Sequence, residues 1–155
     1  MAEAPNLRLL ALDEEDLNVI SAHVQDAVLK VRDMSIVPGT GQFAMAVNRF
    51  AREAGATRKG FRKSYQRRRS ALHFDRVKAV RSIGIDRSDP DQVLALLAVH
   101  FEPDLEPANA PAGEISLVFA GDAMLTLEVE CIEARLTDLG PAWATERAPH
   151  HPLSD

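Results

Sequence analysis

The chain has 155 residues, of which 46% are hydrophobic and 26% are charged, and it contains one cysteine. A chain of this length is expected to form one domain that buries roughly 70% of its unfolded surface. No apolar run approaches the roughly 20 residues needed to cross a bilayer. The single cysteine excludes an internal disulfide framework, and the first residues lack the pattern of a secretory signal, so we expect a cytoplasmic protein.

The formal net charge of −5 conceals a strong separation of charge. Residues 52–81 hold 11 of the 18 Lys and Arg residues but only two acids, Glu53 and Asp75, so this segment carries a charge of +9. The other 125 residues contain 7 basic and 21 acidic residues and sum to −14. Such asymmetry predicts an anionic partner or a contact between copies of the chain.

The N-terminal part predicts a strand followed by a helix. Leu7, Leu9 and Ala11 alternate with Arg8 and Leu10, which is typical of a short strand. Asp13 is suited to cap the helix that follows, and the acids after it lie near the positive end of the helix dipole. Apolar residues recur at helical spacing from Leu17 to Val24, so we predict a helix over about 13–28 that covers a sheet.

A hairpin and a basic segment come next. Pro38-Gly39-Thr40-Gly41 separates two runs with strand character, residues 34–37 and 43–47, which predicts a hairpin. Residues 52–69 contain many bases and little apolar surface to offset the entropy of ordering, so we predict a mobile basic loop there. Residues 72–80 then alternate with one shift of phase, as a strand with a bulge would.

The following apolar run, residues 93–99, is compatible with a buried strand or a helix. The alternation that continues to Pro103 favours the strand. A second hairpin is predicted from two alternating runs, residues 115–119 and 125–129, on either side of a Gly-Asp turn.

The last predicted element is a helix over about 129–139, because apolar residues recur at helical spacing until Gly140-Pro141 ends the pattern. Together the elements predict an α+β domain. It would have a mostly antiparallel sheet or partial barrel of about six or seven strands, an N-terminal helix and this C-terminal helix. The globular domain would span residues 1–143, and we expect residues 144–155 to form a disordered tail.

Three segments carry a resemblance to a known family. They read LDEEDLNVISAHVQDAV, RRRSALHFDRVKAVRSIGIDRSDPD and ECIEARLTDLGPAW. In these segments the chain resembles an uncharacterised family of small bacterial proteins, known as a domain of unknown function. The resemblance implies a bacterial, cytoplasmic setting, and it supplies no activity, cofactor or catalytic residue.

The basic segment is the candidate binding site, because its cations would contact anionic groups and its aromatic rings would offer faces for stacking. Its candidate residues are Arg58, Lys59, Arg62, Lys63, Tyr65, Arg67, Arg68 and Arg69. We interpret the chain as a non-catalytic binding or adaptor protein that engages an acidic protein surface. Binding of RNA or DNA through the same residues is the main alternative, and a small-molecule enzyme is the third. A solvated charged loop is the ordinary explanation.

Other candidate groups also have ordinary explanations. His73 and Asp75 would share one strand face, which suits a metal ion, an acid–base pair or a plain surface pair. Cys131 has no catalytic signature around it and resembles a small buried hydrophobe. The acids at 86–91 lack the spacing of a calcium loop and are typical of a turn. We therefore predict no catalytic residue, metal or cofactor and no membrane partner, and self-association stays open.

Overall fold

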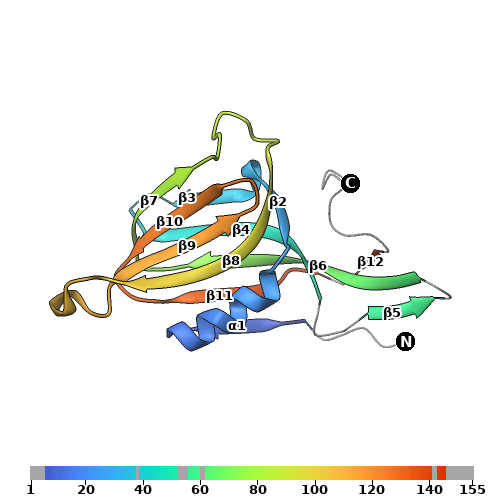
Figure 1. The fold of residues 1–155 in the computed structure, drawn as a ribbon, viewed down its shortest axis with the longest axis horizontal. Coiled ribbons are helices and arrows are strands. Elements are labelled where there is room, and N and C mark those ends of the chain that lie inside the picture. Colours follow the sequence, from blue (N-terminus) through green and yellow to red (C-terminus); the bar gives the residue numbers. More distant parts are fainter. Residues whose placement is uncertain (1–5, 38, 52–55, 60–61, 141–142, 146–155) are drawn as a thin grey trace.

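The computed structural model describes residues 6–37, 39–51, 56–59, 62–140 and 143–145. Figure 1 shows that most of the described residues form antiparallel sheet, with the helix α1 lying against it. The strands are β1 (Arg8–Ala11), β2 (Val28–Lys30), β3 (Met34–Val37), β4 (Gln42–Phe50), β5 (Ala56–Lys59), β6 (Arg62–Phe74), β7 (Val77–Ile83), β8 (Val93–Pro103), β9 (Gly113–Phe119), β10 (Ala123–Val129), β11 (Ala134–Asp138) and β12 (Trp143–Thr145). The described helices are α1 (Glu14–Val24) and the 3-10 turns η1 (Val31–Asp33) and η3 (Pro107–Asn109).

The strands form one continuous sheet in the order β1-β11-β6-β4-β2-β8-β9-β10-β7. Three further strands pair beside this path: β3 with β4, and both β5 and β12 with β6. The sheet curls so that β7, at one end of this order, meets the turn between β3 and β4. There the Val77 amide donates a hydrogen bond to the Gly41 carbonyl at 2.9 Å. An apolar core, led by Phe43, Leu72 and Phe119, fills the concave interior.

Helix α1 begins where the sequence predicts, because the Asp13 carboxylate accepts a hydrogen bond from the Asp16 amide at 2.8 Å. Its apolar stripe, which includes Leu17, is buried against the sheet. The helix ends at Val24 rather than near residue 28. The reason is that Asp26 takes a left-handed conformation, with φ of 66°, and the chain then enters β2.

The predicted α+β class with two helices is wrong. Residues 134–138 of the expected C-terminal helix form β11, which pairs with β1 and β6. Ala134, Leu136 and Asp138 are buried while Arg135 is exposed, so the true period is two. Val129 ends β10, and Ile132 lies in the connection to β11. The apolar residues that fit the helical period therefore belong to two different strands and to the connection between them. The sheet also has more strands than the six or seven predicted, twelve in the described part.

Several expectations for individual strands are confirmed. The preferred strand at 93–99 is part of β8, and the two predicted hairpins are β3–β4 and β9–β10. The bulged strand expected at 72–80 is instead two strands, β6 and β7, which separate at Arg76 with φ of 61°. β6 pairs with β4 and β11, whereas β7 pairs with β10. Within the predicted basic loop the described residues form β5 and the start of β6. Residues 52–55 and 60–61, and the predicted tail from 146 onward, lie outside the described residues.

Candidate functional site

Strand β6 belongs to the body of the sheet for only part of its length. From Phe74 back to Arg67 it pairs with β4, where Arg67 lies opposite Phe50. Before Arg67 it pairs with β5 and β12. We call β5 and residues 62–66 of β6 the cationic hairpin. Figure 1 shows this hairpin extending past the end of the curled sheet, on the right of the view.

The register of the cationic hairpin places like charges opposite each other. Arg58 pairs with Lys63, and Lys59 pairs with Arg62, as Cα partners across the two antiparallel strands. Side chains directly opposite in an antiparallel pair are close neighbours, so like charges there destabilise the pairing. The register therefore places four basic residues in two directly opposite pairs.

At the base of the hairpin the core changes from apolar to ionic. Successive inward positions of β6, from Phe74 through Leu72, lead to Ser70 and then Arg68, all of them buried. Arg68 lies opposite Arg49 of β4 in the sheet register. Because side chains alternate along a strand, these guanidinium groups lie on the same face as the apolar core. The ionic groups thus occupy the end of the core from which the cationic hairpin extends.

One carboxylate, that of Asp138, joins the strands at this point. The Arg49 Nη2 atom donates to both Asp138 oxygens at 2.9 Å, and Nε donates to Oδ1 at 3.1 Å. The Ser70 hydroxyl donates to the same oxygen at 2.6 Å, and the Leu7 amide donates to Oδ2 at 2.7 Å. Arg68 Nε lies 3.8 Å from Oδ2. The Asp138 and Arg49 side chains are both 0% exposed, so this is a buried ionic network.

These contacts determine how Asp138 titrates. Burial alone would raise the pKa of Asp138, but hydrogen bonds from Ser70, the Leu7 amide and Arg49 outweigh it and lower the pKa. The group is therefore ionised at neutral pH. Its charge offsets the positive charge of the arginines on the neighbouring strands.

Arg67 and Arg69, the other two arginines of the triplet 67–69, lie on the opposite face of β6 from Arg68. Arg67 is buried, with its guanidinium carbon 5.4 Å from the centroid of the Phe50 ring, and burial lowers its pKa. Arg69 is partly exposed, donating to Asp33 at 3.2 Å and to Asn48 at 3.1 Å. Both residues therefore hold the outer face of the hairpin base to the body.

Comparison with known proteins gives a family. The pattern of the family described as protein of unknown function (DUF2948) matches residues 7–151. The chain belongs to this family. The match confirms the predicted resemblance to an uncharacterised domain of unknown function, and it assigns no function. No curated protein and no solved structure matches the chain.

The structure divides the predicted site residues of this DUF2948 chain into two groups. Five lie on the cationic hairpin, where the backbone is described: Arg58, Lys59, Arg62, Lys63 and Tyr65. The other three, Arg67, Arg68 and Arg69, lie at its base, where the first two are buried. Sequence reasoning missed Arg49 and Asp138. The available signal was their alternation with buried apolar residues along β4 and β11.

The remaining candidate groups form local pairs. Asp75 accepts hydrogen bonds from Arg135 and Gln42, both at 3.2 Å, and Arg135 also donates to His73 Nδ1 at 3.1 Å. Asp86 accepts from the amide and hydroxyl of Ser88 within a turn. The described residues include no group of three or more His, Cys, Asp or Glu side chains that could hold a metal ion. No described helix of this DUF2948 chain is long and apolar enough to cross a membrane.

Proposed function

We propose that the chain is a non-catalytic binding protein whose cationic hairpin engages an acidic surface of a partner protein. One observation carries the proposal: the hairpin extends beyond the sheet and opposes Arg58 to Lys63 and Lys59 to Arg62. This arrangement opposes folding in the free chain. A partner that places carboxylates near these cations would relieve their repulsion. Binding would therefore offset the free energy that this repulsion costs the folded chain.

Two features favour a protein partner over a nucleic acid. Arg67 and Arg68 are buried, so the hairpin offers fewer cations than its sequence suggests. Tight binding to DNA typically uses about 6–10 phosphate contacts. The rest of the chain is acidic, summing to −14 outside residues 52–81, and would repel a long polyanion that passes the hairpin.

The backbone of the hairpin offers a second means of recognition. In the described part of the chain, β5 pairs with β6 alone, so its outer edge presents unpaired backbone groups. Such an edge accepts an extended strand from a partner, whose side chains then contact those of the hairpin. The edge therefore gives an acidic partner backbone groups to contact in addition to the cations.

We propose the bacterial cytoplasm as the setting. The family resemblance supports this, as does a chain with one cysteine, which suits a reducing compartment. Localising a fluorescently tagged chain in its own cells tests this part of the proposal, and a periplasmic or extracellular signal would refute it.

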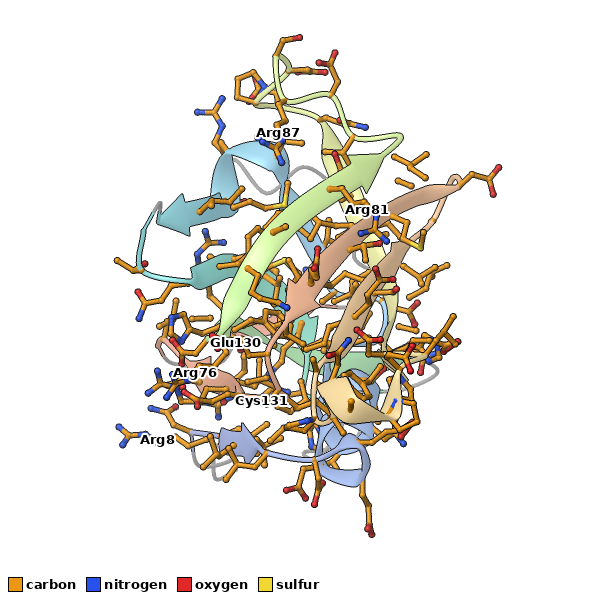
Figure 2. All side chains as sticks on the ribbon, turned by 90° about the vertical axis from the view of Figure 1, so that its left-hand side faces the viewer. Arg8, Arg76, Arg81, Arg87, Glu130 and Cys131 are labelled. Carbon is orange, nitrogen blue, oxygen red and sulfur yellow. The ribbon has the colours of Figure 1, made fainter. Side chains whose placement is uncertain are left out.

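The test is affinity purification of tagged protein from its own cells, with and without nuclease, followed by mass spectrometry. The hairpin variant replaces Arg58, Lys59, Arg62 and Lys63 by Gln. The control variant makes the same charge change in the body by replacing Arg8, Arg32, Arg81 and Arg87 by Gln, all of them exposed. Figure 2 shows three of these control residues, Arg8, Arg81 and Arg87, projecting from the body.

An acidic protein should copurify with wild type and with the control variant after nuclease treatment, and it should be lost with the hairpin variant. Retention of the same proteins by the hairpin variant would refute the proposal. Companions that disappear on nuclease treatment, together with copurifying RNA or DNA, would replace it with nucleic-acid binding.

A further inference from the structure

The end of the molecule opposite the cationic hairpin contains an apolar cleft. The cleft has a volume of about 410 Å³ and lies between the start of α1, the end of β8 and the connection from β10 to β11. Its apolar walls are formed by Leu12, Phe101, Pro103, Pro111 and Ile132. Leu12 is 60% exposed, so part of this apolar surface faces solvent. The volume is within the usual range for a cavity that binds a small group.

The rim of the apolar cleft is acidic. Asp13, Glu14, Asp104 and Glu133 line it, and none of the described residues that line it is basic. Asp13 also caps α1, and the Glu133 Oε1 atom lies 3.7 Å from Arg76 Nε. Glu14 and Asp104 are exposed at the opening. An occupant with an apolar group and flanking positive charges would therefore match both the walls and the rim.

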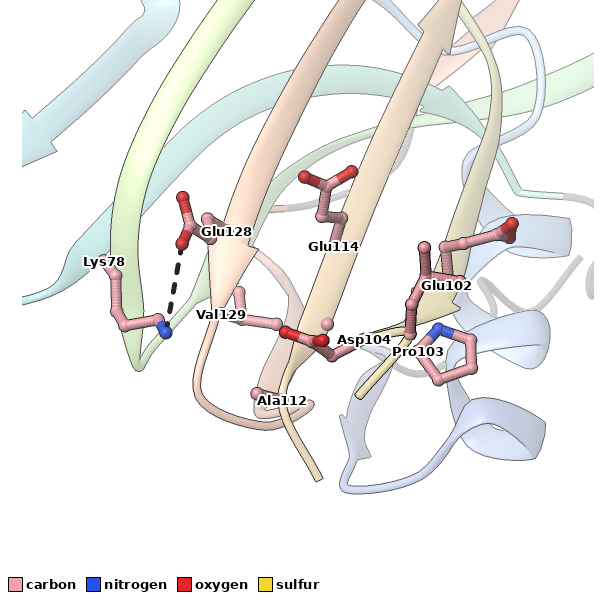
Figure 3. Close-up of a pocket in the computed structure, with 10 residues that line it drawn as sticks. Lys78, Glu102, Pro103, Asp104, Ala112, Glu114, Glu128 and Val129 are labelled. Carbon is pink, nitrogen blue, oxygen red and sulfur yellow. Dashed lines mark ion pairs between the residues drawn. The ribbon is translucent and has the colours of Figure 1, made fainter. Parts of the chain in front are cut away.

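A second cleft adjoins the first and continues the acidic surface. Figure 3 shows Glu102, Asp104, Glu114 and Glu128 around it, with Lys78 Nζ 3.9 Å from Glu128 Oε1. Its volume is about 460 Å³, and it shares Pro103, Asp104 and Ala112 with the apolar cleft. The two clefts thus meet at the loop that joins β8 to β9. Together they offer an apolar site with carboxylates on both sides.

We infer that these paired clefts bind residues 58–63 of a second copy of this chain. The inference rests on the proposed function, because it names the partner of the hairpin. Residues 58–63 read Arg58-Lys59-Gly60-Phe61-Arg62-Lys63 in the sequence, one aromatic residue flanked by four cations. Phe61 supplies the apolar group for the cleft, and the cations meet the carboxylates around it.

The position of the two sites determines the geometry of the contact. Figure 1 shows the β8–β9 connection at the left end of the longest axis and the β5–β6 hairpin at the right end. The two surfaces are therefore far apart on one molecule and join different copies head to tail. A contact of this kind leaves one free hairpin and one free cleft on every dimer, so it extends into a ring or an open chain.

Sedimentation velocity of the full chain over a range of concentrations tests the inference. The cleft variant is Glu14→Gln, Asp104→Asn and Glu133→Gln. Its control makes the same charge change outside both clefts, with Glu15→Gln, Asp122→Asn and Glu130→Gln. Wild type and this control should self-associate. The cleft variant and the hairpin variant should each be monomeric.

Mixing the two defective variants gives the sharpest result. Each retains the half that the other lacks, so an equimolar mixture should form a 1:1 dimer that grows no further. Phe61→Ala keeps every charge and should weaken self-association by about tenfold or more, as removal of a central aromatic anchor does. Full association of Phe61→Ala would show attraction between charges alone and overturn the role of the apolar cleft.

The failure of this inference differs from the failure of the proposed function. A wild-type chain that stays monomeric at all concentrations, or a mixture of variants that forms no dimer, overturns the contact between copies. If affinity purification then still shows an acidic protein that depends on the hairpin, the proposed function stands with another partner. If it shows no such protein, both fail.

Discussion

Removing the carboxylate of Asp138 should be the most damaging small change at the hairpin base. The Asp138 and Arg49 side chains are 0% exposed, and Asp138 accepts hydrogen bonds from Arg49, Ser70 and the Leu7 amide. Asp138→Ala leaves the Arg49 guanidinium buried beside Arg68 without this counter-charge. Breaking a buried ion pair by removing one partner costs about 3–5 kcal/mol. We expect the free energy of unfolding of Asp138→Ala to fall by that amount.

Urea unfolding followed by circular dichroism measures this loss. Glu130→Ala is the control, because Glu130 is an exposed acid in the connection between β10 and β11. Its free energy of unfolding should stay within about 0.5 kcal/mol of wild type. A loss below about 1 kcal/mol for Asp138→Ala would refute a buried ionic network at this point, because an exposed ion pair contributes no more than about 1 kcal/mol.

A paired replacement tests whether charge or packing causes the loss. The double variant Arg49→Met with Asp138→Leu removes both ions and fills similar space. Replacing both partners of a buried pair by apolar groups is often neutral or stabilising. The double variant should therefore be more stable than Asp138→Ala, and an equal or greater loss would show that the shape of the site matters more than its charge.

Three further predictions concern acid, a glycine and a helix cap. Hydrogen bonds lower the pKa of Asp138 in the folded state, so its contribution to the free energy of unfolding is complete above the ordinary pKa near 3.8. That contribution is lost as the pH falls through the lower pKa of the folded state. As the pH falls below about 4, the free energy of unfolding in urea should therefore decrease less for Asp138→Asn than for wild type. Gly113→Ala should cost about 1–3 kcal/mol in thermal unfolding, since a Cβ there would lie 2.4 Å from the Glu102 carbonyl oxygen; an unchanged melting temperature would contradict this. Asp13→Ala should cost about 1 kcal/mol by the same assay, with Asp13→Asn close to wild type.

The sequence predicted best those elements whose signals are local. The cap at Asp13 and the hairpins around Gly39 and Gly121 depend on neighbouring residues, and the structure has them. The helix expected at 129–139 failed because a short run of apolar residues fits either period. Only pairing with β6, more than 60 positions away in the case of Asp138 and Ser70, decides that Ala134 to Asp138 form a strand.

The candidate site shows the same limit. The concentration of positive charge at 52–81 is evident from composition, but composition does not distinguish Arg67, Arg68 and Arg69 from Arg58 or Lys63. The division between buried and hairpin arginines comes from the point at which β4 stops pairing, opposite Arg67. That point depends on a partner strand, so no local pattern within the basic segment contains it.

The same division decides which substitutions can report on binding. An Arg67→Glu, Arg68→Glu, Arg69→Glu chain is the obvious choice from the sequence. In the structure it would bury a carboxylate at position 68 close to Asp138, where Arg68 Nε now lies 3.8 Å from the Asp138 carboxylate. Two buried acids repel each other, and one must take up a proton or the local structure must open. Loss of binding by that chain would therefore follow from unfolding as readily as from lost contacts. Replacing Arg58, Lys59, Arg62 and Lys63 instead removes charge from the hairpin and leaves the buried ionic network around Asp138 unchanged.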